Sequence, residues 1–501
     1  MTFRDQTPGA IRLDGNETTI IFAWTDGVPA ILHHGEKLSE DTDLLGIAAA
    51  LARPEAHATL DINEPVSLHP EPSRGFPGHP ALTGKRRDEP KSWAGKFNLI
   101  DITKQPNRVR FHLTDEPRAL SLDLDCEIDP ESDVATFRTH LLNRGDAPFV
   151  VDWLAPPVIA PDRRYGEFLA FHGRWCAEFA TERRPVSIGT MLRENRRGRT
   201  SHDAFPGIVL LTSTTDQEQG ACLGCHLGWS GNHRLLLECL PNGDRQLQMG
   251  ALFIGEEAVI APGEAIETPP LYIAQSMGGL NALSQKFHDH VRKRILQLPD
   301  PHAPRPVTVN TWEAIYFDHR HERLTALADA AAAIGAERFV LDDGWFRGRR
   351  DDTSSLGDWY PDEEIYPQGL GPIADYVHDK GMQFGLWVEP EMVSPNSDLF
   401  LDHPDWALSV DPYPMITGRN QLVLDIARSE VGNYLFERLA SLISDHDIDY
   451  LKWDMNRDLT LPGGQGGTAV ASRQIDALYS LIDRLLRTFP SLEIESCASG
   501  G

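Results

Sequence analysis

The chain has 501 residues, of which 41% are hydrophobic, so it is long enough for two or three domains with substantial cores, and wholesale disorder is excluded. Its 74 acidic residues outnumber 47 basic ones and give a formal net charge of -27, which would repel a phosphate backbone and excludes nucleic acid as an expected partner. The six cysteines are too few and too irregularly spaced for a disulfide scaffold, which favours a reducing compartment.

The N-terminal residues lack the basic segment followed by an apolar segment that marks a secretory signal peptide. No uncharged apolar run is long enough to cross a bilayer, so no membrane partner is expected. Together with the cysteine usage, these features predict a soluble protein of the cytoplasm.

Residues 1–278 are predicted to form a large β-sandwich domain. Short apolar or alternating runs, such as residues 18–24 and 109–113, are separated by clusters of Gly, Pro, Asp and Asn. Many short strands with frequent turns and no helical period are typical of a sandwich.

One of these runs, residues 221–229, contains the Cys222-x-x-Cys225-His226 pattern of c-type haem attachment. The strand period turns the two cysteines to opposite faces, and no second Cys or His pair follows at zinc-site spacing. We therefore expect strand packing here and predict no metal and no cofactor.

Residues 279–305 are predicted to be a helical and Pro-rich linker, and beyond it strand-like and helix-like segments alternate over residues 306–501. This rhythm predicts parallel strands with right-handed crossovers. Strands are expected at residues 307–310, 337–342, 382–389, 448–454 and 492–496, and helices at 321–335, 368–380, 428–447 and 470–488.

Polar, charged or aromatic residues end nearly every one of these strands, which is where a (β/α)8 barrel keeps its active site. A doubly wound sheet also places ligands at strand ends, but carboxylates on so many successive strands favour the barrel. Only five strands precede Gly501. We therefore expect an incomplete TIM barrel and a sequence that is a fragment of a longer chain.

The last part of the fourth strand carries a site-like set of polar residues. The two-residue strand period places Lys452, Asp454 and Asn456 on one face, so an ammonium and an amide flank one carboxylate. A cation beside an aspartate keeps it ionised, as a nucleophile requires. The alternative is a structural salt bridge at a strand end.

Two adjacent acids, Asp342 and Asp343, end the second strand and are followed by Gly-Trp-Phe. Paired acceptors beside an aromatic face suit a sugar, whose hydroxyls donate to carboxylates while its C–H face stacks on indole. Trp312 and Trp387 at neighbouring strand ends strengthen the carbohydrate interpretation, although tryptophans are often core residues.

Several long motifs, in the same order and over nearly the whole chain, resemble those of the glycoside hydrolase family 36 α-galactosidases. They are Gly173-Arg-Trp175, Gly198-Arg-Thr-Ser-His202, Trp229-Ser-Gly-Asn232, Trp312-Glu-Ala-Ile-Tyr-Phe317, Asp342-Asp-Gly-Trp-Phe346, Gly357-Asp-Trp359, Leu386-Trp-Val-Glu-Pro-Glu-Met392, Asn420-Gln-Leu-Val-Leu-Asp425, Lys452-Trp-Asp-Met-Asn-Arg457 and Glu495-Ser-Cys-Ala-Ser-Gly-Gly501.

The resemblance implies an N-terminal β-supersandwich, a (β/α)8 catalytic barrel and a C-terminal β-domain that hydrolyse terminal α-galactosides with retention and without a cofactor. It implies that Asp454 is the nucleophile and that Asp342 and Asp343 bind the galactose 4- and 6-hydroxyls. It also implies a homo-oligomer, commonly a tetramer, acting on melibiose or raffinose-type oligosaccharides. The residues implied to complete the pocket are Trp387, Arg419, Lys452, Asn456, Cys497, Gly500, Trp312 and, from a neighbouring subunit, Trp175.

The sequence departs from the family in two places. The family's general acid/base is an aspartate on a later barrel strand, and the sequence ends before that position, so no residue is assigned the role. A loop that carries a Gly-Asp-Tyr-Arg-Glu-Pro-like motif in many relatives is replaced around residues 85–90. This replacement affects aglycone recognition and the tetrameric arrangement.

Three other functions share these residues. Galactosyl transfer to a sugar acceptor, as in the raffinose-family synthases, uses the same pocket. An α-N-acetylgalactosaminidase would differ around Cys497, where a cysteine resembles the galactose-specific pattern. A chain that truly ended at Gly501 would be a catalytically incomplete carbohydrate-binding fragment.

Overall fold

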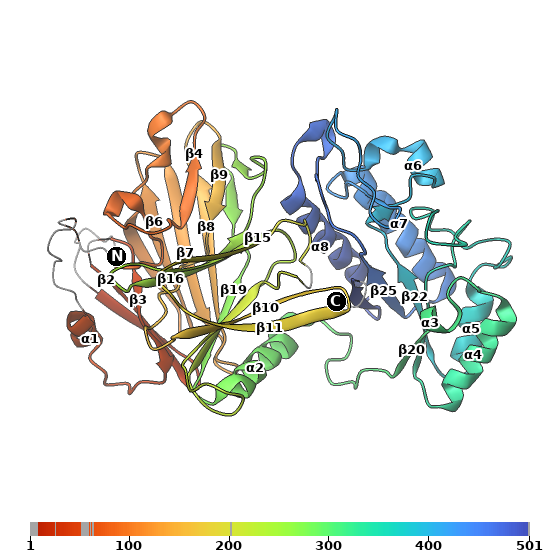
Figure 1. The fold of residues 1–501 in the computed structure, drawn as a ribbon, viewed down its shortest axis with the longest axis horizontal. Coiled ribbons are helices and arrows are strands. Elements are labelled where there is room, and N and C mark those ends of the chain that lie inside the picture. Colours follow the sequence, from red (N-terminus) through yellow and green to blue (C-terminus); the bar gives the residue numbers. More distant parts are fainter. Residues whose placement is uncertain are drawn as a thin grey trace. The chain divides into compact units, whose positions relative to one another are not determined.

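The computed structural model describes residues 9–25, 27–51, 60, 62, 65–200 and 203–498. The chain divides into two compact units (Figure 1). Unit 1 comprises Met1–Arg196 and Thr200–Ile295, and unit 2 comprises Arg197–Arg199 and Leu296–Gly501. The division after Ile295 falls within the segment 279–305 that the sequence marks as a linker.

Unit 1 is built from antiparallel sheets whose strands alternate between buried and part-exposed residues. In β7 (Leu120–Ile128), every second residue from Leu120 is buried, and the serine, aspartates and glutamate between them are part-exposed. A sheet that rests one face on a core requires this two-residue period. The predicted N-terminal β domain is therefore confirmed.

The largest sheet among the described residues has ten strands. In sheet order they are β11 (Ala177–Pro185), β10 (Glu167–Arg174), β13 (Gly207–Leu211), β14 (Cys222–Leu227), β19 (Leu271–Ser276), β8 (Ala135–Asn143), β7, β6 (Arg108–Asp115) and β5 (Asn98–Lys104), with β18 (Ala265–Glu267) beside β8. Unit 1 also has three smaller sheets of three strands each among the described residues. The first consists of β1 (Gly9–Asp14), β2 (Thr18–Trp24) and β3 (Ala30–Glu36), and the second of β12 (Gly189–Asn195), β15 (His233–Cys239) and β16 (Arg245–Ala251). The third consists of β17 (Val259–Ile260), β9 (Phe149–Leu154) and β4 (Leu82–Lys85).

The haem-like Cys-x-x-Cys-His segment forms β14, in the middle of the large sheet. Both Cys222 and Cys225 are buried there. Cys222 packs in an apolar cluster with Leu283 of α2 (Gly279–His290), and burial raises the pKa of its thiol to about 11. These cysteines are packing residues of the sheet.

Unit 2 contains a five-stranded parallel sheet in the part of the chain that the structure describes. The order of the strands across the sheet is the same as their order along the chain. In a doubly wound sheet, by contrast, later strands are added on the other side of the first strand, so the strand order reverses there. The strands of unit 2 are, in order, β20 (Thr308–Asn310), β21 (Arg338–Leu341), β22 (Gln383–Val388), β25 (Tyr450–Asp454) and β26 (Glu493–Cys497). The predicted half-barrel is therefore confirmed.

Four helices connect these strands, and each contacts the next, so they form one layer as in the outer ring of a barrel (Figure 1). They are α4 (His321–Ala333), α5 (Gly371–Asp379), α7 (Ser429–His446) and α8 (Ala471–Thr488). Apolar side chains of the strands, such as Phe339 and Phe384, meet apolar helix faces that include Leu435 and Leu485 in one core cluster. This packing fixes the strand ends that carry the polar residues.

Short elements complete the fold and lie mainly in the loops. They are α1 (Leu44–Leu51), α3 (Trp312–Ile315), α6 (Asp398–Asp402), β23 (Met392–Val393), β24 (Leu422–Val423), the 3-10 turns Pro72–Arg74, Pro90–Trp93, Pro404–Trp406 and Gln465–Gly467, and the π-helical turn Val291–Ile295.

Candidate active site

Acidic residues lie at the carboxyl ends of three neighbouring strands of unit 2. Asp342 and Asp343 follow β21, Glu389 follows β22, and Asp454 is the last residue of β25. Parallel strands end at the same edge of their sheet, so the fold brings these carboxyl groups together. All four residues are buried, between 1% and 7% exposed. Each therefore needs partners inside the protein.

Lys452 is ion-paired with Asp342. Its Nζ donates to Oδ2 of Asp342 at 2.8 Å, and Nδ2 of Asn310 donates to the same oxygen at 2.7 Å. Burial lowers the pKa of Lys452, but the charge and hydrogen bond of Asp342, together with the charges of Cys497 and Asp454, outweigh burial, so the net pKa is raised and the ammonium stays charged.

The strand pattern predicts that this ammonium flanks Asp454. Its hydrogen bond is made to Asp342, and the charge of Asp454 also raises the pKa of Lys452. β21 and β25 are alternate strands with β22 between them. In a barrel the inward side chains of alternate strands share a layer. The Lys452 ammonium therefore reaches the carboxylate two strands away.

Asp343 is held by Arg349, which the sequence analysis did not select. The Arg349 side chain is 2% exposed, and its Nε and Nη2 donate to the two oxygens of Asp343 at 2.9 and 2.8 Å. Burial raises the pKa of Asp343, and Arg349 opposes the shift. Three arginines lie in residues 347–350, and their spacing did not indicate which one turns inward.

Asp454 accepts three hydrogen bonds that fix the plane of its carboxylate. Its Oδ2 accepts from Nε1 of Trp387 at 3.1 Å and from Nδ2 of Asn456 at 2.6 Å. Its Oδ1 accepts from the backbone N–H of Met455 at 3.0 Å. The structure therefore joins Asp454, Trp387 and Asn456, three of the residues that the sequence selected.

Trp387 is a buried wall of this site. Its ring lies nearly parallel to that of Phe346, with 6.3 Å between centroids, and its carbonyl accepts from Nε1 of Trp345 at 2.9 Å. The side chain is only 3% exposed, so its polar contribution to the site is the indole N–H that bonds Asp454. Aromatic packing holds that donor in place.

Glu389 is a second residue that the candidate site gains from the structure. Its Oε1 accepts from the backbone N–H of Asn456 at 2.7 Å, and its Oε2 accepts from Nε2 of Gln421 at 3.1 Å. Burial, followed by the charge of Asp454, raises the pKa of Glu389 to about 8. At neutral pH Glu389 is therefore mostly a neutral acid that supports the backbone of Asn456.

Arg419 lies on an exposed two-residue turn with Asn420. Both residues have positive φ values, 51° and 61°, and Gly418 and Gln421 pair across the turn. Left-handed residues at both central positions are what a tight type I′ turn requires. The charge of Arg419 lowers the pKa of Glu389, which places Arg419 at the edge of the same polar cluster.

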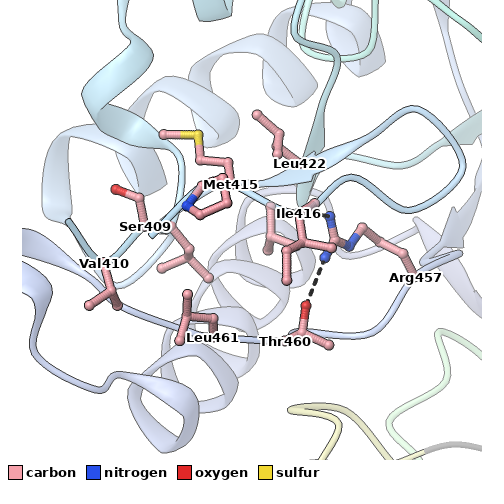
Figure 2. A pocket seen from close by; sticks show the side chains of 11 residues that line it. Ser409, Val410, Met415, Ile416, Leu422, Arg457, Thr460 and Leu461 are labelled. Atoms are coloured by element: carbon pink, nitrogen blue, oxygen red, sulfur yellow. Dashed lines mark hydrogen bonds between the residues drawn. The ribbon is translucent and has the colours of Figure 1, made fainter. Parts of the chain in front are cut away.

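Arg457 anchors the loop that carries this turn. Its Nη1 donates to the carbonyls of Ile416 and Gln421 at 2.8 and 2.7 Å. Figure 2 shows the Arg457 guanidinium beside Ile416, with its Nη2 bonded to Thr460 at 3.4 Å. The pocket drawn there has a volume of about 20 Å³, which is room for one water molecule. It is too small for a sugar.

Trp312 and Cys497 lie at the two outer strands of the half-barrel. The backbone N–H of Trp312 donates to Oδ1 of Asn310 at 2.8 Å, and Asn310 also binds Asp342. Cys497, at the end of β26, is paired in register with Asp454 and is part-exposed. Trp312 is thus linked to the site through Asn310, and Cys497 is linked to it by strand pairing.

The other two selected residues lie outside the described part of unit 2. Trp175 belongs to unit 1, where it lies on the turn between β10 and β11 and is 62% exposed. Gly500 lies outside the described residues.

The described residues contain no metal-binding cluster and no membrane-spanning helix. Within the described ranges, no group of three or more His, Cys, Asp or Glu residues is arranged to hold a metal ion. Across the same residues, no helix is both long and apolar enough to span a bilayer.

Comparison with known proteins places this architecture in a family. The model described as glycosyl hydrolase family 36 N-terminal domain matches residues 27–254, and the model described as melibiase matches residues 265–501. The chain is 42% identical over 453 residues to an alpha-galactosidase of Escherichia coli. The aligned region covers 90% of this chain and 63% of the relative. It is 40% identical over 340 residues to alpha-galactosidase AgaA of Geobacillus stearothermophilus. This aligned region covers 67% of this chain and 47% of the relative.

Solved structures agree with this assignment. The AgaA structure in complex with raffinose has a TM-score of 0.91 at 30% identity and covers 98% of this chain and 72% of that chain. The chain spans about half to two thirds of the length of the two curated relatives. The two family models, the identities and the shared fold show that the chain belongs to glycosyl hydrolase family 36.

Proposed function

We propose that this chain supplies the galactose-binding residues and the nucleophile of a retaining α-galactosidase that hydrolyses terminal α-D-galactosyl residues. One observation carries the proposal: the Asp454 carboxylate ends a barrel strand and is held by the side chains of Trp387 and Asn456. The relatives support it, because they are named alpha-galactosidases, and AgaA has been solved with raffinose and stachyose.

The reaction is a double displacement. Asp454 attacks the anomeric carbon through an oxocarbenium-like transition state, the bond to the leaving oxygen breaks, and a covalent galactosyl enzyme forms. Water then attacks the same carbon and releases galactose with its original configuration. The hydrogen bonds from Trp387 and Asn456 orient the attacking carboxylate, so less reorganisation is required at the moment of attack.

Retention requires a proton donor about 5 to 5.5 Å from the nucleophile. In the family that the chain resembles, that role belongs to an aspartate on a later barrel strand, and no residue of this sequence is assigned to it. Glu389 carries a proton at neutral pH, but it is 1% exposed and both oxygens bond to protein donors. Glu389 is therefore a supporting residue, and we do not assign it the role of general acid/base.

In this proposal the sugar is bound by the carboxylates of Asp342 and Asp343, which are ion-paired with Lys452 and Arg349. Lys452 and Arg349 neutralise Asp342 and Asp343 and fix their orientation. Each carboxylate oxygen has two acceptor sites, so these groups still accept the 4- and 6-hydroxyls of galactose. Cys497 and Gly500 lie toward the 2-hydroxyl in this proposal, with Trp312 and Arg419 bordering the pocket.

The assembly and location are also proposals. We infer a cytoplasmic homo-oligomer, commonly a tetramer in the family, in which Trp175 of unit 1 reaches a neighbouring site. The exposed position of Trp175 on a hairpin turn supports that role.

Proton NMR of an aryl α-galactoside with a good leaving group tests the function, because such a substrate needs little acid assistance. We expect α-galactose to appear before mutarotation, and an Asp454→Asn variant to be inactive. Asp458→Asn is the matched control, because Asp458 lies four residues on and is half-exposed beside Arg197. Release of β-galactose first would contradict the mechanism, and an active Asp454→Asn variant would contradict the nucleophile assignment. Added sugar acceptors separate hydrolysis from galactosyl transfer.

A further inference from the structure

A second cavity lies in unit 1, between β4, the 3-10 turn Pro90–Trp93 and the segment that begins at His69. Its volume is about 270 Å³. Buried His69, Glu71 and Arg118 line its interior, and exposed Lys85 and Trp93 line its opening. Lys85 begins the segment 85–90 that replaces the family's loop motif, and the proposed galactosidase function assigns the other four residues no role.

His69 is the feature that points to a ligand. It is 1% exposed, and among the described residues neither of its ring nitrogens has a hydrogen-bond partner. Its ring packs against Phe97, with centroids 5.3 Å apart and planes 88° apart. Burial, then the charges of Arg118 and Arg74, lowers the pKa of His69 to about 3, so the ring is neutral. A neutral imidazole offers one donor and one acceptor.

The charged groups of the interior are already paired. Nε of Arg118 donates to Asp115 at 2.7 Å, and Nε of Arg74 donates to Glu71 at 3.0 Å. Glu71 also accepts the backbone N–H of Phe97, and burial raises its pKa to about 7. Two exposed charges of opposite sign, Lys85 and Asp152, also line the cavity, so its lining offers no excess of either charge, which favours a neutral ligand.

Trp93 gives the opening an aromatic surface. Its side chain is 64% exposed, unlike Trp387 of the candidate active site, which is 3% exposed. An exposed indole beside polar groups suits the C–H face of a sugar ring. The cavity volume of about 270 Å³ is many times the volume of about 10–15 Å³ that one water molecule needs on the same measure, which leaves room for a sugar ring.

We propose that this cavity binds one ring of a neutral sugar, with the indole of Trp93 against its C–H face and the ring nitrogens of His69 bonded to its hydroxyls. A hydroxyl both donates and accepts, so it satisfies either nitrogen of the imidazole. An apolar ligand would leave both nitrogens unsatisfied. A ligand of about twelve heavy atoms binds with a Kd on the order of millimolar.

Fluorine NMR of the full chain labelled with 5-fluorotryptophan tests the proposal. The Trp93 resonance is assigned from a Trp93→Phe variant and followed during titration with methyl α-D-galactopyranoside. An Asp342→Asn background weakens the candidate active site of unit 2, so that failure of the galactosidase proposal does not affect the result. We expect a saturable shift of the Trp93 resonance, with the resonances of the buried Trp153 and Trp229 of unit 1 unmoved.

Two variants link this shift to the cavity. His69→Phe keeps the ring contact with Phe97 and removes both nitrogens, so we expect binding at least ten-fold weaker. Trp93→Ala changes an exposed residue, and we expect it to abolish saturation transfer to the sugar in the same background. A Trp93 resonance that does not move, or that moves equally in His69→Phe, overturns the proposal. A shift that follows protein concentration without sugar also overturns it, because a second copy of the chain would then cover the cavity.

Discussion

Glu389→Gln is expected to make the stability of unit 2 less dependent on pH. The pKa of Glu389 rises from 4.5 to about 8 in the folded protein, chiefly through burial. Between these values the unfolded chain has lost this proton while the folded protein keeps it. Unfolding therefore releases a proton, and the free energy of unfolding falls as pH rises through this window. Stability from this group is complete below pH 4.5 and is lost toward pH 8.

The size of the effect follows from proton linkage. One proton contributes about 1.4 kcal/mol per pH unit, so the wild-type protein should lose about 2 to 3 kcal/mol relative to Glu389→Gln between pH 5 and pH 7. Glutamine keeps the acceptor for the backbone N–H of Asn456, so the local geometry is retained. The difference between the two proteins should therefore widen steadily with pH.

Hydrogen exchange of peptides from β22 and β25, corrected for intrinsic rates, measures this difference within unit 2. Glu391→Gln is the matched control, because Glu391 is also buried but is ion-paired with Arg199. Nε1 of Trp453 also donates a hydrogen bond to Glu391 at 3.0 Å. That variant breaks a buried ion pair and should be less stable than wild type at pH 7. A Glu389→Gln difference that stays constant from pH 5 to pH 7 would refute the neutral state of Glu389.

Three further substitutions test the site. Lys452→Ala should lower kcat/KM for an aryl α-galactoside by about 100-fold or more, with a smaller effect on folding. Kinetics and thermal unfolding measured in parallel would show this. An unchanged kcat would mean that Lys452 does not belong to the site. Arg349→Met should cost about 3–5 kcal/mol, because it leaves Asp343 buried without its partner, and Asp343→Asn in the same chain should recover part of that loss in urea unfolding. Trp387→Phe removes one donor to Asp454 and should lower kcat about ten-fold with little change in KM; an equal rise in KM would instead indicate a role in substrate binding.

The sequence predicts most of the fold because its local periods are clear. The strand periods and the alternation of strands with helices indicate a β domain followed by a barrel, and the polar residues after β21 and β25 mark the edge where the site lies. The observed strand order removes the doubly wound alternative, which sequence periodicity alone could not do. Chain order across a sheet is a tertiary property.

The partners within the site could not be predicted in the same way. Lys452 bonds Asp342 across an intervening strand, and Arg349 turns back from a loop to bind Asp343. Both contacts depend on barrel layers and loop paths that leave no periodic signal. Glu389 was visible as a strand-end acid, but its neutral state follows from burial and the nearby Asp454, which only the packed structure shows.

The most direct test of the central claim is to trap the covalent intermediate with a fluorinated α-galactosyl fluoride and map the adduct by peptide mass spectrometry. The account predicts one sugar on the peptide that contains Asp454, formed with loss of fluoride and absent in Asp454→Asn. A sugar attached to another residue, or an adduct that persists in Asp454→Asn, would contradict the assignment of Asp454 as the nucleophile.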